Sequence, residues 1–193
     1  MDLYKVNVKF YLHDGQDLEP EDWFGTFNTW VPDTPDEVLV DVADYSHVHQ
    51  GPVTLLVGHE ANYSIDNTDG ELGLLYNRKQ PLDGDLSGRL HTVFRNALKA
   101  CRRLEADPTI GDRVRFRGNA ALLMLNDRLH APNTEETLAA LRPGLEGLLA
   151  ALYAGANVRL RRNPDPKQRF ALNIQAEGDW DIATLLKNLE NSF

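Results

Sequence analysis

Apolar and polar residues alternate with a period of two near the start of the chain. Val6, Val8, Phe10 and Leu12 fall on one side of residues 4–12, and the residues between them are mostly polar. This alternation predicts a strand with one buried face. Similar patterns, or short apolar runs bounded by turn residues, predict further strands at residues 38–48, 53–60, 71–77, 113–117, 121–126, 157–162 and 169–175.

A second set of segments has apolar residues at helical spacing. The clearest is residues 85–105, where Leu90, Phe94, Leu98 and Cys101 belong to one stripe. Pro143-Gly144 interrupts another of these segments and should kink or split that helix. The other helices are expected over residues 20–31, from about Thr134 onward, and after Asp179 or Asp181.

These elements together predict an α+β fold. Most connections between strands are short, so we expect an antiparallel sheet with helices packed on one face. From Val53 onward the order of elements suggests strand-strand-helix units that are repeated up to three times. The length of 193 residues fits a single domain over residues 1–193, and residues 106–112 are where a subdivision would fall.

The composition favours a protein of the cytoplasm. Cys101 is the only cysteine, so no disulfide can form within the chain, and a reducing compartment is the natural location. No apolar run approaches the roughly 20 residues that cross a bilayer. The first residues are acidic and alternating, unlike a secretory signal peptide. We therefore expect no membrane association.

Charge is distributed unevenly along the chain. The net charge is -9, but residues 1–77 hold only two Lys or Arg against fifteen Asp or Glu, whereas residues 78–169 are net basic. Such asymmetry indicates either a surface for a charged partner or an acidic part that docks on a basic part. The acidic total argues against nucleic acid as a partner.

The predicted hairpin over residues 38–60 carries the first candidate site. With a two-residue turn at Gln50-Gly51, Asp44 and His59 lie diagonally on the apolar face of two neighbouring strands. A buried carboxylate needs a partner, and an imidazole held by a carboxylate can act as an acid or base. Asp44 and His59 are therefore candidate catalytic residues, although such a pair more often belongs to a structural network.

The other face of the same hairpin offers a candidate metal site. His47 and His49 are two residues apart, which places both imidazoles on one side of a strand. A His-x-His pair is a weak signal, and the simpler interpretation is a solvated strand face. A metal ion would need further ligands from a bulge or another loop.

Arginines give a third candidate site. Along the predicted strands at residues 113–117 and 157–162, apolar side chains point inward and guanidinium groups point outward. If the strands share a sheet, they form one basic surface suited to carboxylate or phosphate groups. The five arginines of this surface are Arg113, Arg115, Arg117, Arg159 and Arg161.

Common catalytic and nucleotide-binding motifs are missing. The sequence contains no Gly-x-Ser-x-Gly, no P-loop, no Gly-x-Gly-x-x-Gly and no His-Glu-x-x-His. Residues 41–48, DVADYSHV, and 131–137, APNTEET, resemble segments of a bacterial family of uncharacterised proteins. That resemblance implies no activity, cofactor or site.

The sequence therefore predicts an accessory or regulatory protein that binds an anionic ligand or an acidic protein through its arginines. The alternative is a small enzyme built on the Asp/His pair and dependent on a metal if the two histidines bind one. The sequence identifies no cofactor.

Overall fold

The alternating segment at the start of the chain forms β1 (Val6–Leu12), which lies in the interior of an antiparallel sheet. The computed structural model describes residues 5–14 and 17–192. Within them the sheet has eight strands in the order β2-β3-β4-β5-β1-β6-β8-β7. The further strands are β2 (Leu39–Asp44), β3 (Pro52–Gly58), β4 (Ala61–Asp66), β5 (Gly73–Arg78), β6 (Phe116–Leu125), β7 (Val158–Arg162) and β8 (Phe170–Ala176).

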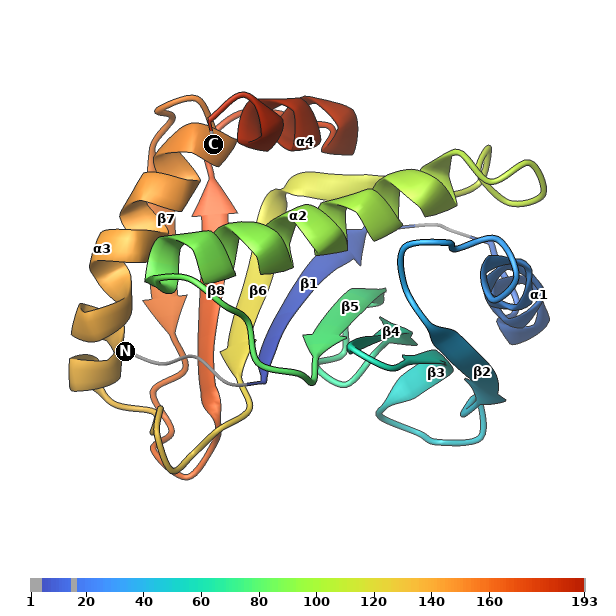
Figure 1. The fold of residues 1–193 in the computed structure, drawn as a ribbon, viewed down its shortest axis with the longest axis horizontal. Coiled ribbons are helices and arrows are strands. Elements are labelled where there is room, and N and C mark those ends of the chain that lie inside the picture. Colours follow the sequence, from blue (N-terminus) through green and yellow to red (C-terminus); the bar gives the residue numbers. More distant parts are fainter. Residues whose placement is uncertain (1–4, 15–16, 193) are drawn as a thin grey trace.

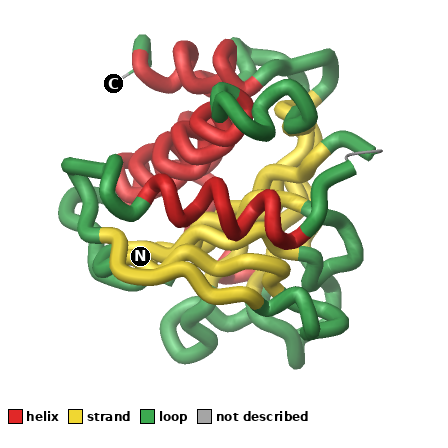
Figure 2. Tube along the Cα trace, turned by 90° about the vertical axis from the view of Figure 1, so that its right-hand side faces the viewer, coloured by secondary structure: helices red, strands yellow, loops and turns green. Residues whose placement is uncertain are grey.

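Helices cover one face of this sheet, as predicted (Figure 1). They are α1 (Pro20–Trp30), α2 (Leu86–Glu105), α3 (Glu135–Leu152) and α4 (Ile182–Glu190). The long helix α2 contacts β1 and β5, α4 contacts β6, and α1 contacts β2 and β3. Figure 2 shows α2 and α4 on one side of the strands. Among the described residues, no helix is long and apolar enough to cross a membrane.

The core lies between α2 and the central strands. Phe10 of β1 and Phe94 of α2 are fully buried and meet edge to face, with ring centroids 6.3 Å apart. Burying a side chain of this size contributes about 2–3 kcal/mol to folding. Cys101 is also fully buried, as the sequence predicted, and burial raises the pKa of its thiol well above the ordinary value.

Several predicted elements need correction. Residues 61–66 form β4, which the sequence interpretation missed, and the two strands predicted around residues 113–126 are the single strand β6. Helix α3 continues through Pro143 instead of splitting there. The repeated strand-strand-helix order predicted from Val53 onward is also wrong. Three strands, β3 to β5, lie between that point and α2, and only β6 lies between α2 and α3, so only the last unit is as predicted.

The face of the sheet opposite the helices carries a buried lysine. Lys9 of β1 is almost completely buried, and its Nζ forms ion pairs with Asp66 (3.1 Å) and Asp69. The Tyr11 hydroxyl donates to the second carboxylate oxygen of Asp69 at 3.0 Å. Thr68 donates to Asp66 through its hydroxyl at 2.7 Å. These contacts tie the centre of the sheet to the turn between β4 and β5.

Candidate functional site

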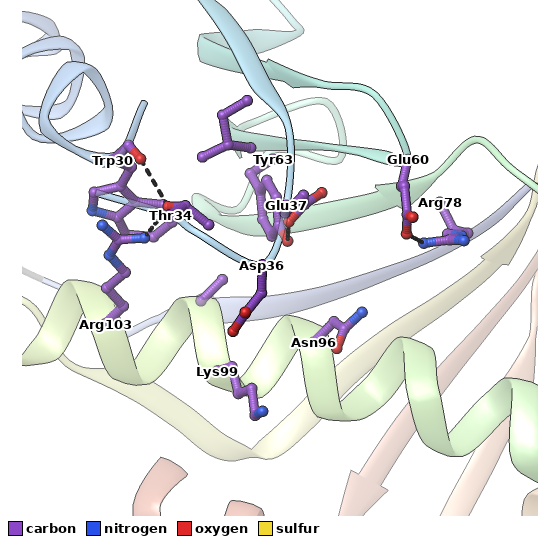
Figure 3. Close-up of a pocket in the computed structure, with 12 residues that line it drawn as sticks. Trp30, Thr34, Asp36, Glu37, Glu60, Tyr63, Arg78, Asn96, Lys99 and Arg103 are labelled. Carbon is purple, nitrogen blue, oxygen red and sulfur yellow. Dashed lines mark hydrogen bonds and ion pairs between the residues drawn. The ribbon is translucent and has the colours of Figure 1, made fainter. Parts of the chain in front are cut away.

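A cavity of about 290 Å³ opens between α2, residues 31–38 and strands β4 and β5 (Figure 3). This volume is near the lower end of the range for small-molecule pockets, about 300 Å³. Trp30 and Tyr63 give the cavity two aromatic walls. Its charged lining residues are Asp36, Glu37, Glu60, Arg78, Lys99 and Arg103.

One wall of the cavity is a polar stripe of α2. Asn96, Lys99 and Arg103 are three and four residues apart, so they lie on the same side of the helix. The opposite side of α2 is held on the sheet by its buried apolar stripe, which includes Phe94 and Leu98. Packing of the apolar stripe therefore fixes which way the polar stripe faces.

Arg103 is the most constrained cation of the cavity. Its Nη1 donates to the Thr34 hydroxyl at 2.7 Å, and that hydroxyl donates to the Trp30 carbonyl at 2.7 Å. The guanidinium also lies 4.4 Å from the Trp30 ring centroid, a cation–π contact. Burial lowers the pKa of Arg103, and the negative charges of Asp33 and Asp107 oppose this shift from a distance. Among the described residues no carboxylate is close enough to form an ion pair with it. Arg103 is thus a partly desolvated cation that is held in position by neutral groups.

A carboxyl group and a phenol face each other on the sheet side of the cavity (Figure 3). The Tyr63 hydroxyl donates to Glu37 Oε2 at 2.6 Å. Burial raises the pKa of the Glu37 carboxyl, although the hydrogen bond from Tyr63 opposes this shift. Burial likewise raises the pKa of Tyr63, so the phenol stays protonated. Glu37 is therefore easier to protonate than an ordinary surface glutamate.

The end of the cavity beside β5 is closed by an ion pair. Arg78 Nη1 lies 2.5 Å from Glu60 Oε2, and Arg78 Nε donates to the Gln80 carbonyl at 2.9 Å. Asn96 Nδ2 donates to the Tyr76 hydroxyl at 3.2 Å. Arg78 already has its partners, so Arg103 and Lys99 are the cations that remain for a bound molecule.

The predicted contact between Asp44 and His59 is wrong. Asp44 pairs with Thr54 in the β2–β3 ladder, whereas Leu39 pairs with Gly58. His59 therefore lies at the other end of the hairpin, roughly 16 Å away at the rise of a strand. Both residues are exposed, and a hydrogen bond from the Ser46 N–H lowers the pKa of Asp44. The error arose because residues 45–51 form a longer loop than the predicted turn at Gln50-Gly51.

The prediction that two histidines lie on one side of a strand is also wrong. His47 and His49 lie in the loop after β2, and both are exposed. His47 stacks near Tyr45, with ring centroids 6.3 Å apart. Within the part of the chain that the structure describes, no group of three His, Cys, Asp or Glu side chains is arranged to hold a metal ion.

The predicted single surface of five arginines is not formed. Arg113 and Arg115 precede β6 instead of lying in it, and β8 separates β6 from β7. The protein's own carboxylates partner three of the five, in the ion pairs Arg113–Asp22, Arg117–Glu71 and Arg159–Glu177. The Arg115 guanidinium donates to two backbone carbonyls at 2.6 Å. Arg161 is exposed on β7.

The sequence interpretation did not assemble the cavity. Lys99 and Arg103 were visible as the polar side of a helix, but their partners come from distant segments around Thr34, Glu37 and Tyr63. A usable signal was present in residues 61–66, where apolar and polar residues alternate. Recognising that strand would have placed Tyr63 on the helix-covered face.

Comparisons with known proteins do not assign a family. No protein-family model matches the chain, and no curated protein matches it. The resemblance of residues 41–48 and 131–137 to a bacterial family stays a prediction.

Proposed function

We propose that this protein works by binding a small anionic molecule in the cavity beside α2. The observation that carries the proposal is Arg103, a partly buried guanidinium with no carboxylate partner among the described residues. A guanidinium binds a carboxylate or phosphate group through two parallel hydrogen bonds. Lys99, four residues away on the same wall, adds a second positive charge.

Other lining residues restrict the ligand further. Asp36 and Glu37 supply carboxyl oxygens that accept hydrogen bonds, and Trp30, beside Arg103, supplies an aromatic surface. A simple anion would leave these acceptors unused and would be repelled by Asp36. The ligand class that fits is a small carboxylate or phosphate compound that also carries a hydroxyl or amino group.

Replacing Arg103 by methionine should strongly weaken this binding while the fold is kept. Methionine keeps the alkyl packing on Trp30 but removes the charge and the donors. We expect affinity for hydroxy- or amino-carboxylates, with L-malate and L-glutamate as probes, to fall at least about tenfold. Thermal unfolding measured at matched ionic strength, with and without each probe, reports this through the rise in Tm.

The matched control is Arg113→Met, which removes an exposed arginine paired with Asp22 outside the cavity. It should leave the probe-induced rise in Tm unchanged. An equal loss in both variants, or an undiminished rise in Arg103→Met, would contradict the assignment of the cavity.

A second candidate function is acid-base chemistry at Glu37. Its raised pKa and its 2.6 Å hydrogen bond from Tyr63 are the specific observations that favour it. A carboxyl in a cavity whose pKa is shifted toward neutral pH is suited to donate or accept a proton. In this version the same ligand is a substrate, and Arg103 orients its anionic group.

The titration of Glu37 gives a pH-dependent prediction. Because the folded pKa is raised above its ordinary value of 4.5, the stabilising contribution of this group is full below that value. It is lost as pH rises through the raised folded pKa. Glu37→Gln should therefore gain stability relative to the natural protein between pH 4 and pH 7. Since the side chain is only half buried, we expect a gain of under about 1 kcal/mol.

Urea unfolding of both proteins at the two pH values measures this difference. The amide oxygen of the Glu37→Gln variant can still accept the Tyr63 hydrogen bond, so loss of that bond does not complicate the comparison. A stability difference that stays constant between the two pH values would show that the Glu37 pKa is not raised.

A further inference from the structure

The two edges of the sheet differ in charge. β2 forms one edge and β7 the other, and they lie at opposite ends of the sheet (Figure 1). An edge strand has backbone N–H and C=O groups that no neighbouring strand uses, so it can pair with a strand of another chain. Figure 2 looks onto the β2 end, with α1 running alongside the nearest strands.

The β7 edge is basic. Arg159 and Arg161 pair with Gln175 and Asn173 of β8, which places both arginines on the face opposite the helices. Arg159 forms only an exposed contact of 3.4 Å with Glu177, and Arg161 forms no ion pair with any residue that the structure describes. Leu160, on the other face of the strand, is partly buried. A surface ion pair such as Arg159–Glu177 is weak and easily exchanged.

The β2 edge is acidic and partly apolar. Asp41 and Asp44 are exposed, and no Lys or Arg occurs between Lys9 and Arg78 in the sequence. Val40 in the same strand is 61% exposed. The Val42 N–H donates to its neighbour's carboxylate, Asp41 Oδ1, at 2.9 Å. A carbonyl oxygen from a partner strand would replace that contact and free Asp41 for a cation.

Strand direction makes these two edges compatible. Every neighbouring pair in the sheet is antiparallel, and the sheet has eight strands, so β2 and β7 run in opposite directions. A second copy moved along the sheet would therefore bring its β2 antiparallel to β7 of the first copy, with the same face outward. Asp41 and Arg161 then lie on one face of the joined sheet.

The symmetric alternatives bring like charges together. Pairing β2 with β2 of a second copy would place carboxylates opposite carboxylates, and pairing β7 with β7 would place arginines opposite arginines. Like charges directly opposite each other across two strands are destabilising. Only the head-to-tail pairing joins an acidic edge to a basic one.

We propose that copies of this chain associate head to tail, with the β2 edge of one copy paired to the β7 edge of the next. The contact uses a different surface on each copy, so further copies can add unless the arrangement closes into a ring. The acidic partner of Arg159 and Arg161 is then a second copy of the chain. This inference is independent of the proposed cavity ligand.

Sedimentation velocity over a range of protein concentrations tests the proposal. The natural protein should self-associate, and raising the salt concentration should weaken association because exposed charges are screened. Asp41→Lys/Asp44→Lys and Arg159→Glu/Arg161→Glu should each weaken association by about tenfold or more. Mixed in equal amounts, the two variants should associate again, because each supplies the edge that the other now complements.

The control is Arg128→Glu/Lys187→Glu, which changes the net charge as much as the β7 variant but lies away from both edges. It should associate like the natural protein. The proposal is overturned if the natural protein stays monomeric at every concentration, if neither edge variant weakens association, or if the mixture remains monomeric.

Discussion

Lys9→Met is expected to lower the free energy of unfolding by about 3–5 kcal/mol, the range measured when one partner of a buried ion pair is removed. The Lys9 side chain is only 1% exposed, and the Asp66 side chain with which it pairs is 6% exposed. Methionine fills most of the same volume, so the effect comes from the charge and not from a cavity. Without Lys9 the buried carboxylate of Asp66 has lost its cation.

Two variants identify the cause of this loss. Lys167→Met, which replaces an exposed lysine, should change stability by no more than about 0.5 kcal/mol. Adding Asp66→Asn and Asp69→Asn to Lys9→Met should recover part of the loss, because the stranded negative charges are then gone. Urea unfolding measures all three proteins. A loss of under about 1 kcal/mol for Lys9→Met would show that the three charges do not form a buried network.

Gly118→Ala is expected to lower the free energy of unfolding by about 3 kcal/mol, at the upper end of the range for overpacking. A Cβ at Gly118 would overlap the carbonyl oxygen of Trp180, which lies just before the start of α4. Backbone cannot rotate away as a flexible side chain can, so either β6 or the start of α4 must shift. The buried Tyr153 hydroxyl, which donates to the Gly118 carbonyl at 3.1 Å, would be disturbed as well.

Gly147→Ala is the matched control in helix α3. A Cβ there meets nothing within 4 Å, and alanine is a better helix former than glycine by about 1 kcal/mol. Thermal and urea unfolding should therefore show opposite signs for the two glycine-to-alanine changes. Equal effects would mean that β6 and α4 do not approach each other at Gly118.

Local patterns were enough to predict the fold class. The apolar stripe of α2 follows from which face of the helix is buried, a property of neighbouring residues. The alternation in β1 predicted the strand, but the expected solvent-exposed face was wrong, because every residue of β1 is buried. β4 was missed although it alternates, because Asn62, Ser64 and Asp66 are residue types common in turns. These polar residues lie on the face of the sheet that the helices leave uncovered.

The candidate sites failed for a different reason. The pairing of β2 with β3 depends on the length of the loop at residues 45–51, and a shift of register by an odd number of residues exchanges the two faces. Asp44 does share a face with Val42, as predicted, but its neighbour on β3 is Thr54, and the odd-numbered residues of β3 were assigned to the wrong face. The cavity around Arg103 could not be assembled from the sequence, because its walls meet only after α2 packs across the sheet.

The most direct test of the proposed function is a titration observed by two-dimensional ¹⁵N NMR. The Arg103 side-chain Nε–Hε signal and the Trp30 indole signal report on the cavity, and the Trp180 indole, which lies outside the cavity, is the internal reference. With L-malate or L-glutamate as the probe, we predict saturable shifts of the first two signals and none of the third. Unchanged Arg103 and Trp30 signals at saturating probe, or shifts confined to Arg159 and Arg161, would contradict the proposal that this cavity binds the ligand.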